Sequence, residues 1–126
     1  MNQRLYFYRS RVLSVYDGDT IRVDLDLGCG LHSMGENGKG LVLRLWGINA
    51  PELRGPERDD GLKSRDWLRD ALSPENSDYP LIVETKLDKT GKFGRLLAVL
   101  WQETDNGWVN LNRRMVDLGL AREYLP

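Results

Sequence analysis

The alternation of apolar and polar side chains along the chain predicts five short β-strands. Residues 4–14 and 20–27 alternate in this way and are rich in β-branched or aromatic types, as half-buried strands are. Residues 41–48 form a third predicted strand, and residues 81–87 and 95–101 form a fourth and a fifth. The chain is therefore predicted to be mainly β.

Two helices complete the predicted element order. The first spans about residues 58–72, because Trp67, Leu68 and Leu72 share one face while charged side chains occupy the other. The second is short and spans about residues 111–118. The resulting order β-β-β-α-β-β-α predicts a five-stranded OB-type β-barrel, with a helix after the third strand and a short C-terminal helix.

Turn and cap residues agree with these boundaries. Five glycines fall within residues 28–40, which are predicted to form a mobile loop at the tip of a hairpin. Asn110 or Asn112 lies where the second helix needs an N-cap. Gly119 lies where that helix would end in a left-handed residue, with Leu120 as its apolar contact.

Length and composition favour a single domain. The 126 residues fit one core, and 40% hydrophobic with 29% charged residues is ordinary for a globular protein. No apolar stretch approaches the roughly 18 residues that a membrane helix needs. Cys29 is the only cysteine, so no internal disulfide can form. We expect residues 1–126 to form one domain and the protein to be a monomer.

The N-terminus lacks the long apolar segment of a secretory signal. We therefore expect a cytoplasmic protein if the sequence is complete, and a secreted one if a signal was removed.

The net charge limits how the chain could hold a nucleic acid. Eighteen Lys and Arg residues against nineteen Asp and Glu residues give a net charge of −1 and a pI near 5.8. A protein that binds nucleic acid through its overall field is usually basic. Any nucleic-acid site in this chain must therefore be local.

Asp19 is the first candidate site residue. It closes the Asp-Gly-Asp turn at residues 17–19, between the first two predicted strands. Such turns are common in hairpins, and their acidic side chains are usually solvated. A carboxylate here becomes a candidate ligand only if other oxygen atoms and cations converge on it.

Arg44 and Glu52 lie in a segment that could meet this turn. Arg44 sits on a predicted core strand, where a guanidinium needs an anionic partner. That partner is either a phosphate or a protein carboxylate in a fixed Arg–Asp pair. Glu52 follows Pro51, which would hold the carboxylate steady over a site; the alternative is an exposed loop residue.

A third basic group opens the fifth predicted strand. Arg95 either projects from the barrel mouth or is an exposed strand-end arginine, and Lys92 adds a nearby cation. His32 is interpreted as a surface residue and Cys29 as incidental. The sequence contains no His/Cys metal cluster, no Ser-His-Asp set and no phosphate-binding glycine motif.

Together these residues match the needs of phosphodiester hydrolysis. Metal and guanidinium groups balance the charge that grows on phosphoryl oxygens, and a carboxylate orients or deprotonates water. A metal site made only of oxygen ligands favours Ca²⁺, Mg²⁺ or Mn²⁺ over zinc.

Three blocks of sequence resemble the signatures of the thermonuclease (staphylococcal nuclease-like) family: residues 15–20 (VYDGDT), 44–52 (RLWGINAPE) and 93–95 (FGR). Their order and spacing match, and the resemblance covers roughly residues 9–122. The family cuts DNA and RNA with Ca²⁺ on an OB-fold barrel and leaves 3′-phosphates. The resemblance therefore implies a Ca²⁺-dependent endonuclease.

The resemblance also implies roles for single residues in metal binding and proton transfer. Asp19, Asn49 and the backbone carbonyl of Ala50 match the positions that hold Ca²⁺. Glu52 matches the residue assigned as the general base or as the group that orients water.

The remaining matched positions contact the substrate. Arg44 and Arg95 match the two arginines that bind phosphate and stabilise the transition state. Lys92 and Phe93 lie at substrate-binding positions, although Phe93 stands where a tyrosine hydroxyl can contact phosphate.

Asn49 marks the main departure from the family pattern, because many members have Asp there. Its amide oxygen can still coordinate Ca²⁺, but the site loses one negative charge and its affinity should fall. An active nuclease is favoured by the intact Arg44, Glu52 and Arg95. The alternative, favoured by Asn49, is a catalytically weak or inactive OB module that binds nucleic acid or a protein partner.

Overall fold

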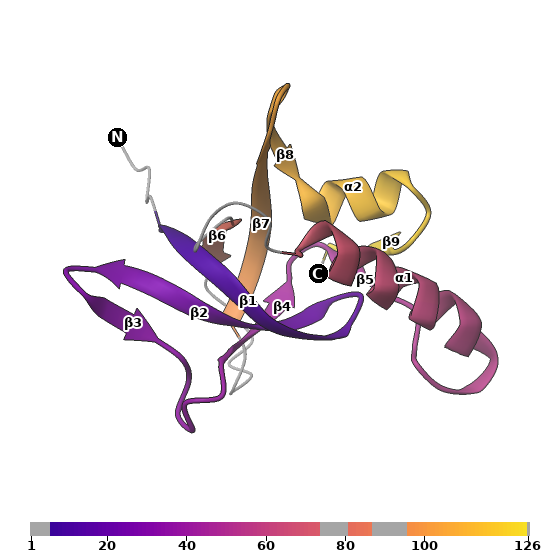
Figure 1. The fold of residues 1–126 in the computed structure, drawn as a ribbon. Helices are drawn as coiled ribbons and strands as arrows, with labels where there is room; N and C mark the ends of the chain where they lie inside the picture. Colours follow the sequence, from indigo (N-terminus) through magenta and orange to yellow (C-terminus); the bar gives the residue numbers. More distant parts are fainter. Residues whose placement is uncertain (1–5, 74–80, 87–95, 126) are drawn as a thin grey trace.

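A ring of five strands forms the centre of the computed structural model, which describes residues 6–73, 81–86 and 96–125 (Figure 1). The strands are β1 (Phe7–Asp17), β2 (Thr20–Gly28), β4 (Leu41–Leu45), β6 (Leu81–Lys86) and β7 (Leu96–Thr104). Their order is β1-β6-β7-β4-β2, and β1 also pairs with β2, so the ring closes. The predicted fold class is confirmed: mainly β with two helices, consistent with an OB-fold.

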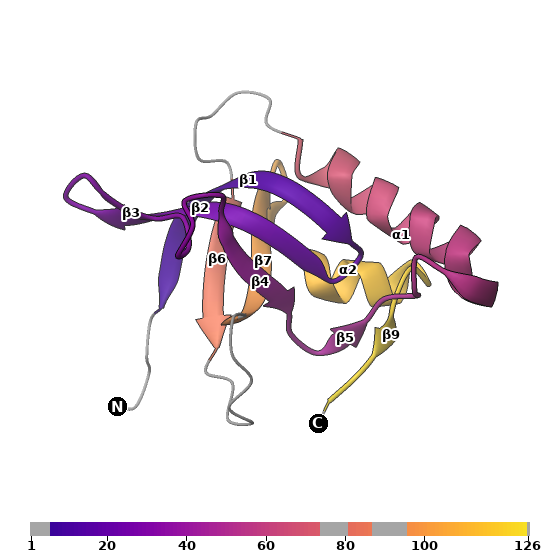
Figure 2. The same cartoon turned by 90° about the horizontal axis from the view of Figure 1, so that it is seen from below.

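Strand β1 closes the ring because it is long enough to pair on both sides. Residues 7–10 pair with β6, and residues 10–17 pair with β2. Register shifts after Val12 and Val15 mark irregularities of the β-bulge type, which bend a strand and increase its twist. The bend carries the β1–β2 turn towards helix α1 (Arg58–Ala71), as Figure 2 shows from below.

Aliphatic side chains from the strands and both helices fill the core. Ile21 of β2 and Leu43 and Leu45 of β4 are at most 1% exposed, and their spacing of two residues is the strand alternation seen in the sequence. Leu68 of α1 and Met115 of α2 (Leu111–Asp117) are fully buried against them. The helices therefore complete the core that the strands begin.

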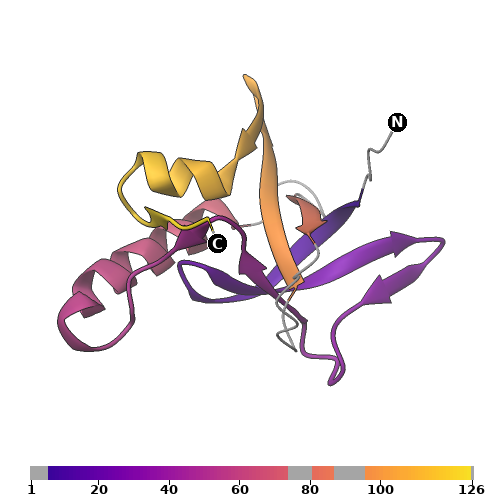
Figure 3. The ribbon, with the colours of Figure 1, turned by 180° about the vertical axis from the view of Figure 1, so that it is seen from behind.

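Both helices lie at the same end of the barrel, which is clearest from behind (Figure 3). Helix α1 follows the short 3-10 helix η1 (Gly55–Glu57) and packs on β1, whereas α2 packs on β7. The Asn110 side chain accepts a hydrogen bond from the Arg113 N–H at 3.1 Å, and Gly119 has a φ of 74°. The predicted cap and left-handed end of α2 are thus confirmed. Within the described ranges, no helix is long and apolar enough to cross a membrane.

Three short strands were not predicted. Strand β3 (Leu31–Ser33) pairs with β2, so the prediction of a loop throughout residues 28–40 is wrong for these residues. Strand β8 (Gly107–Asn110) forms a hairpin with β7, and β9 (Arg122–Glu123) pairs with β5 (Ile48–Asn49). Each has only two to four residues, which is too short for a recognisable alternation.

The third predicted strand, residues 41–48, is interrupted. Strand β4 ends at Leu45, and Gly47 has a φ of 80°, in the left-handed region that favours glycine. After this break β5 belongs to a separate two-stranded sheet with β9. The break turns the chain back towards the barrel end, where the candidate site residues lie.

Candidate functional site

The turn at residues 17–19 joins β1 to β2 and is tied to β4. Asp17 Oδ1 accepts a hydrogen bond from the Asp19 N–H at 3.0 Å, and the Asp19 carbonyl accepts one from the Leu45 N–H at 2.8 Å. Asp19 is only 7% exposed. It is therefore not the solvated acid that turn chemistry alone would lead us to expect.

Helix α1 packs directly on this turn because glycine occupies position 18. A Cβ atom at Gly18 would collide with Ser64 Oγ and would lie 2.8 Å from the Ala50 Cβ. Gly61, one helical turn earlier, packs against the Glu52 carbonyl, where a Cβ would also collide. Small residues on both sides thus bring α1 against the turn and against the 49–52 loop.

Arg44 connects the turn to the 49–52 loop. Its Nη1 lies 2.7 Å from Asp19 Oδ2, and its Nη2 donates to Asn49 Oδ1 at 2.9 Å and to the Ile48 carbonyl at 3.3 Å. The Arg44 side chain is 18% exposed, so the pair is largely removed from water. Ionic interactions are stronger in such surroundings than in water. The fixed Arg–Asp pair, one of the two alternatives for Arg44, is therefore present.

Asp19 uses both carboxylate oxygens within this cluster. Oδ2 also accepts a hydrogen bond from the Ala50 N–H at 2.9 Å, and Oδ1 accepts one from the Thr20 hydroxyl at 3.2 Å. The structure thus brings Asp19, Arg44, Asn49 and Ala50 together at one end of the barrel. Four residues from three separate segments meet through direct hydrogen bonds and one ion pair.

The pKa values of the two acids in the turn move in opposite directions. Burial, together with a hydrogen bond with the Asp19 side chain, raises the pKa of Asp17 to about 6. Burial also acts to raise the pKa of Asp19, but hydrogen bonds from Asp17 and the Ala50 N–H and the charge of Arg44 outweigh it. The pKa of Asp19 is therefore lowered, and Asp19 is the carboxylate of the turn that stays ionised.

Glu52 lies on the same loop in a different environment, because its side chain is exposed. Its backbone N–H donates to Glu57 Oε2 at 3.2 Å, and its carbonyl faces Gly61. This exposure agrees with the loop-residue alternative. It is also compatible with a base that acts on water, since such a group must reach solvent-derived water.

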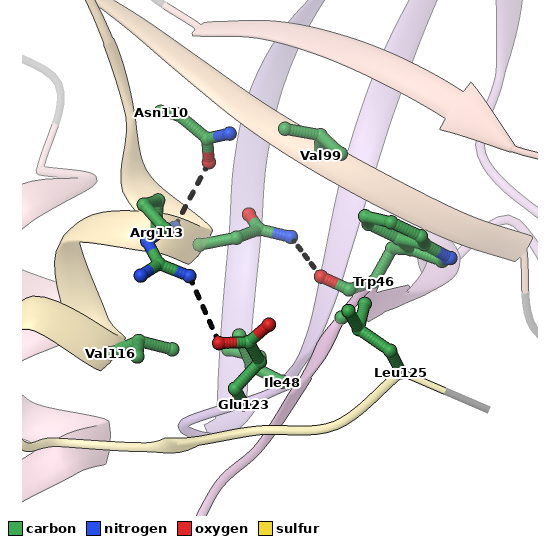
Figure 4. Close-up of a pocket in the computed structure, with 10 residues that line it drawn as sticks. Trp46, Ile48, Val99, Asn110, Arg113, Val116, Glu123 and Leu125 are labelled. Carbon is green, nitrogen blue, oxygen red and sulfur yellow. Dashed lines mark hydrogen bonds and ion pairs between the residues drawn. The ribbon is translucent and has the colours of Figure 1, made fainter.

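Behind the loop, buried polar contacts hold the break after β4. Asn112 donates to the Trp46 carbonyl at 2.9 Å and accepts from the Leu100 N–H at 3.0 Å, while the Tyr124 N–H donates to the Gly47 carbonyl at 2.8 Å. These contacts border a pocket of about 190 Å³ between β7, α2 and the C-terminal residues (Figure 4). Asn112, considered only as a cap from sequence, is thus a core link that supports the site.

The oxygen atoms of the cluster fit a hard cation in type. Asp19, Asn49 and the Ala50 carbonyl offer oxygen donors alone, as Ca²⁺ and Mg²⁺ prefer. Among residues 6–73, 81–86 and 96–125, no three His, Cys, Asp or Glu side chains gather as a metal site. Asp19 is therefore the only ionised ligand of the predicted set, and it already meets Arg44, so a cation held here would bind weakly.

Three predicted site residues, Lys92, Phe93 and Arg95, lie outside the described residues. Their roles stay predictions. The next residue in the chain, Leu96, begins β7 and pairs with Leu43 of the neighbouring parallel strand.

Ser64 was not identified from the sequence. It is fully buried against the turn, and its hydroxyl has no hydrogen-bond partner within the described parts of the chain. The spacing of Gly61 and Ser64, both small and on the face that carries Leu68, is the signal that could have revealed this contact.

The interpretation of His32 as a surface residue is confirmed, because the residue is exposed. His32 lies on β3 and its side chain is 36% exposed, but its Nδ1 lies 2.9 Å from Asp24 Oδ1. The Asp24 side chain is buried and also meets Arg11 at 3.3 Å. His32 therefore joins β3 to the barrel, away from the Asp19 cluster.

Comparisons with known proteins place the chain in a family. A family model described as staphylococcal nuclease homologue matches residues 42–125, more than half of the chain and a range that includes Arg44, Asn49 and Glu52. The chain is also 26% identical over 137 residues to the uncharacterized protein MJ1439 of Methanocaldococcus jannaschii. This alignment covers 94% of the chain. The chain spans 60% of the length of that relative. On the family match, the chain belongs to the staphylococcal nuclease homologue family.

Proposed function

We propose that the chain is a Ca²⁺-dependent nuclease that hydrolyses phosphodiester bonds of DNA or RNA as a monomer and leaves 3′-phosphates. The observation that carries the proposal is the Asp19–Arg44–Asn49 cluster, with Glu52 three residues after Asn49 on the same loop. Family membership supports a nucleic-acid substrate.

Arg44 retains donors for a phosphate. A guanidinium carries five N–H donors, and three of them are directed at Asp19, Asn49 and the Ile48 carbonyl. The remaining two can meet phosphoryl oxygens. Because the guanidinium is already fixed by Asp19, little reorganisation is needed as negative charge develops on the phosphate. Arg95 would supply a second guanidinium.

Asp19, Asn49 and the Ala50 carbonyl would hold Ca²⁺. When bound, the ion would supply positive charge beside the phosphoryl oxygens and so stabilise the charge that develops there. Asp19 contributes the negative charge of the set, since its pKa is lowered. Asn49 contributes a neutral oxygen.

Glu52 would accept the proton of the attacking water. The water oxygen forms a bond to phosphorus while the bond from phosphorus to the 5′ oxygen breaks, which leaves the phosphate on the 3′ side. The 5′ oxygen leaves as an alkoxide and takes up a proton from solvent water, and Glu52 returns its proton to solvent. Lys92 and Phe93 would contact the substrate beside Arg95.

A binding module without catalysis is the second candidate function. It is favoured by the direct contacts of Arg44 with Asp19 and Asn49, which already compensate the guanidinium, and by the neutral side chain at position 49. Such a module would retain nucleic acid or a protein partner but would not cut.

Digestion of plasmid DNA and of RNA distinguishes these functions. We expect cleavage with millimolar Ca²⁺, loss of cleavage in EGTA, and products whose mobility changes after phosphatase treatment. Asp19→Asn, purified in the same way and shown to be folded by circular dichroism, controls for contaminating nucleases and should be inactive. Undiminished cleavage in EGTA with EDTA would contradict Ca²⁺ dependence, and retention of nucleic acid without cleavage would favour the binding module.

A further inference from the structure

The carboxylate of Glu57 links the 49–52 loop to the C-terminal strand. Its Oε2 accepts the hydrogen bond from the Glu52 N–H at 3.2 Å, and its Oε1 lies 4.0 Å from Nη2 of Arg122. Glu57 ends η1, and Arg122 begins β9. One exposed side chain therefore touches two segments that lie about 70 residues apart in the sequence.

Strand β9 lies directly beside the start of the loop. Asn49 of β5 pairs with Arg122, and Ile48 pairs with Glu123; Figure 2 shows the two strands side by side. Asn49, Glu57 and Arg122 also line a common cleft of about 520 Å³. Glu57 and Asn49, which begins the 49–52 loop, therefore border the same cleft.

Among the described residues, the contacts of Glu52 are made by its backbone. Pro51 has no N–H, so the Glu52 N–H is the first backbone donor after Ala50, and Glu57 accepts from it. The Glu52 carbonyl is confined by Gly61 of α1. The Glu52 N–H is therefore held by a hydrogen bond and its carbonyl by packing against α1, while the residue itself is exposed.

We propose that Glu57 is a positioning residue for Glu52. This inference rests on the proposed function, because it gives Glu57 a role only if Glu52 acts on water. A displacement of about 1 Å at a reacting group is enough to slow an enzyme strongly. The Glu57 hydrogen bond restricts that displacement without touching the substrate.

Kinetics of two substitutions at Glu57 test the proposal. Glu57→Ala removes the acceptor and should lower kcat about tenfold, with KM and Tm close to the parent values. Glu57→Gln keeps an acceptor oxygen and should stay within about twofold of the parent kcat. Glu36→Ala, at an exposed glutamate of the 34–40 segment, is the control and should change nothing. A parental kcat for Glu57→Ala, or equal losses for the Ala and Gln variants, would overturn the proposal.

Hydrogen exchange of the Glu52 amide, followed by NMR, separates this inference from the proposed function. We expect exchange at least tenfold faster in Glu57→Ala than in the parent, with Glu57→Gln near the parent rate. Equal exchange in all three proteins would overturn the positioning role even if the parent cuts nucleic acid. If the parent cuts nothing, the proposed function fails, and the exchange rates still decide whether Glu57 holds Glu52.

Discussion

The two halves of the candidate site differ in their exposure to solvent. Asp19 is buried and Arg44 is mostly buried; the two are joined at 2.7 Å and connected to the loop by further hydrogen bonds. Glu52, on the same loop, is exposed and held through its backbone. The first half is therefore part of the fold, whereas the carboxylate of the second contributes little to stability.

This difference follows from the energetics of buried charge. An ionised carboxylate removed from water needs a partner, and removal of that partner leaves an uncompensated charge in the interior. An exposed carboxylate keeps its hydration whether or not the protein is folded. Substitutions in the buried half should therefore change stability and activity together, and those at Glu52 should change activity alone.

The largest expected effect is on activity at the exposed half. Glu52→Gln keeps the shape of the side chain and removes its basic oxygen, so the cleavage rate should fall by about 10²–10⁴. The Tm should stay close to that of the parent. Glu103→Gln, at an exposed glutamate of β7, is the matched control and should leave both values unchanged. A fall in Tm of several degrees for Glu52→Gln would remove the contrast between the halves.

The next effect is on the stability of the buried half. Arg44→Met keeps length but leaves Asp19 without its ionic partner, so the free energy of unfolding in urea should fall by roughly 3 kcal/mol near neutral pH. Arg122→Met, at an arginine whose side chain is 81% exposed, should stay within about 0.5 kcal/mol of the parent. Equal losses in the two variants would mean that the Arg44–Asp19 pair contributes no more to the free energy of unfolding than an exposed arginine does.

A smaller effect concerns the pH dependence of the turn. Because the pKa of Asp17 is raised from 3.8 to about 6, the folded state binds this proton more tightly than the unfolded state does. This contribution to stability is present below pH 4 and is lost as the pH rises through 6. Asp17→Asn keeps an acceptor for the Asp19 N–H and removes the charge.

In EGTA at pH 7.5, Asp17→Asn should be more stable than the parent. The expected gain is on the order of 1 kcal/mol, because partial solvent access screens the group. Near pH 4 the two urea midpoints should coincide. A constant difference between the proteins across this range would show that the substitution acts through packing and not through the Asp17 proton.

The barrel was predictable because its signals are local and periodic. The alternation of apolar and polar residues along β2 and β4 matches the burial of Ile21 and Leu43. The N-cap of α2 is visible in the sequence because Asn110 directly precedes the predicted helix. Strands β3, β8 and β9 carry no such signal, since they are short and pair through backbone groups. Their positions depend on the partner strand rather than on their own side chains.

The site was predictable in its residue types but not in its contacts. Asp19 and Arg44 could be identified as candidates, yet the choice between a phosphate and a fixed pair for Arg44 depends on the approach of β2, β4 and the 49–52 loop. The packing of Ser64 against Gly18 and the bond from Asn112 to Trp46 join residues more than 40 positions apart. No local pattern carries such contacts, because they arise only when the helices pack on the closed barrel.

Calorimetric titration of the parent and of Asn49→Asp with Ca²⁺ decides whether the buried half is the cation site. The substitution adds a negative charge where Asn49 Oδ1 now meets Arg44 at 2.9 Å. We expect the Kd for Ca²⁺ to fall roughly fivefold, because the charge of the ligands controls Ca²⁺ affinity and the divalent ion outweighs the single charge of Arg44. An unchanged Kd, or no Ca²⁺ binding by either protein, would contradict a cation site in the buried half.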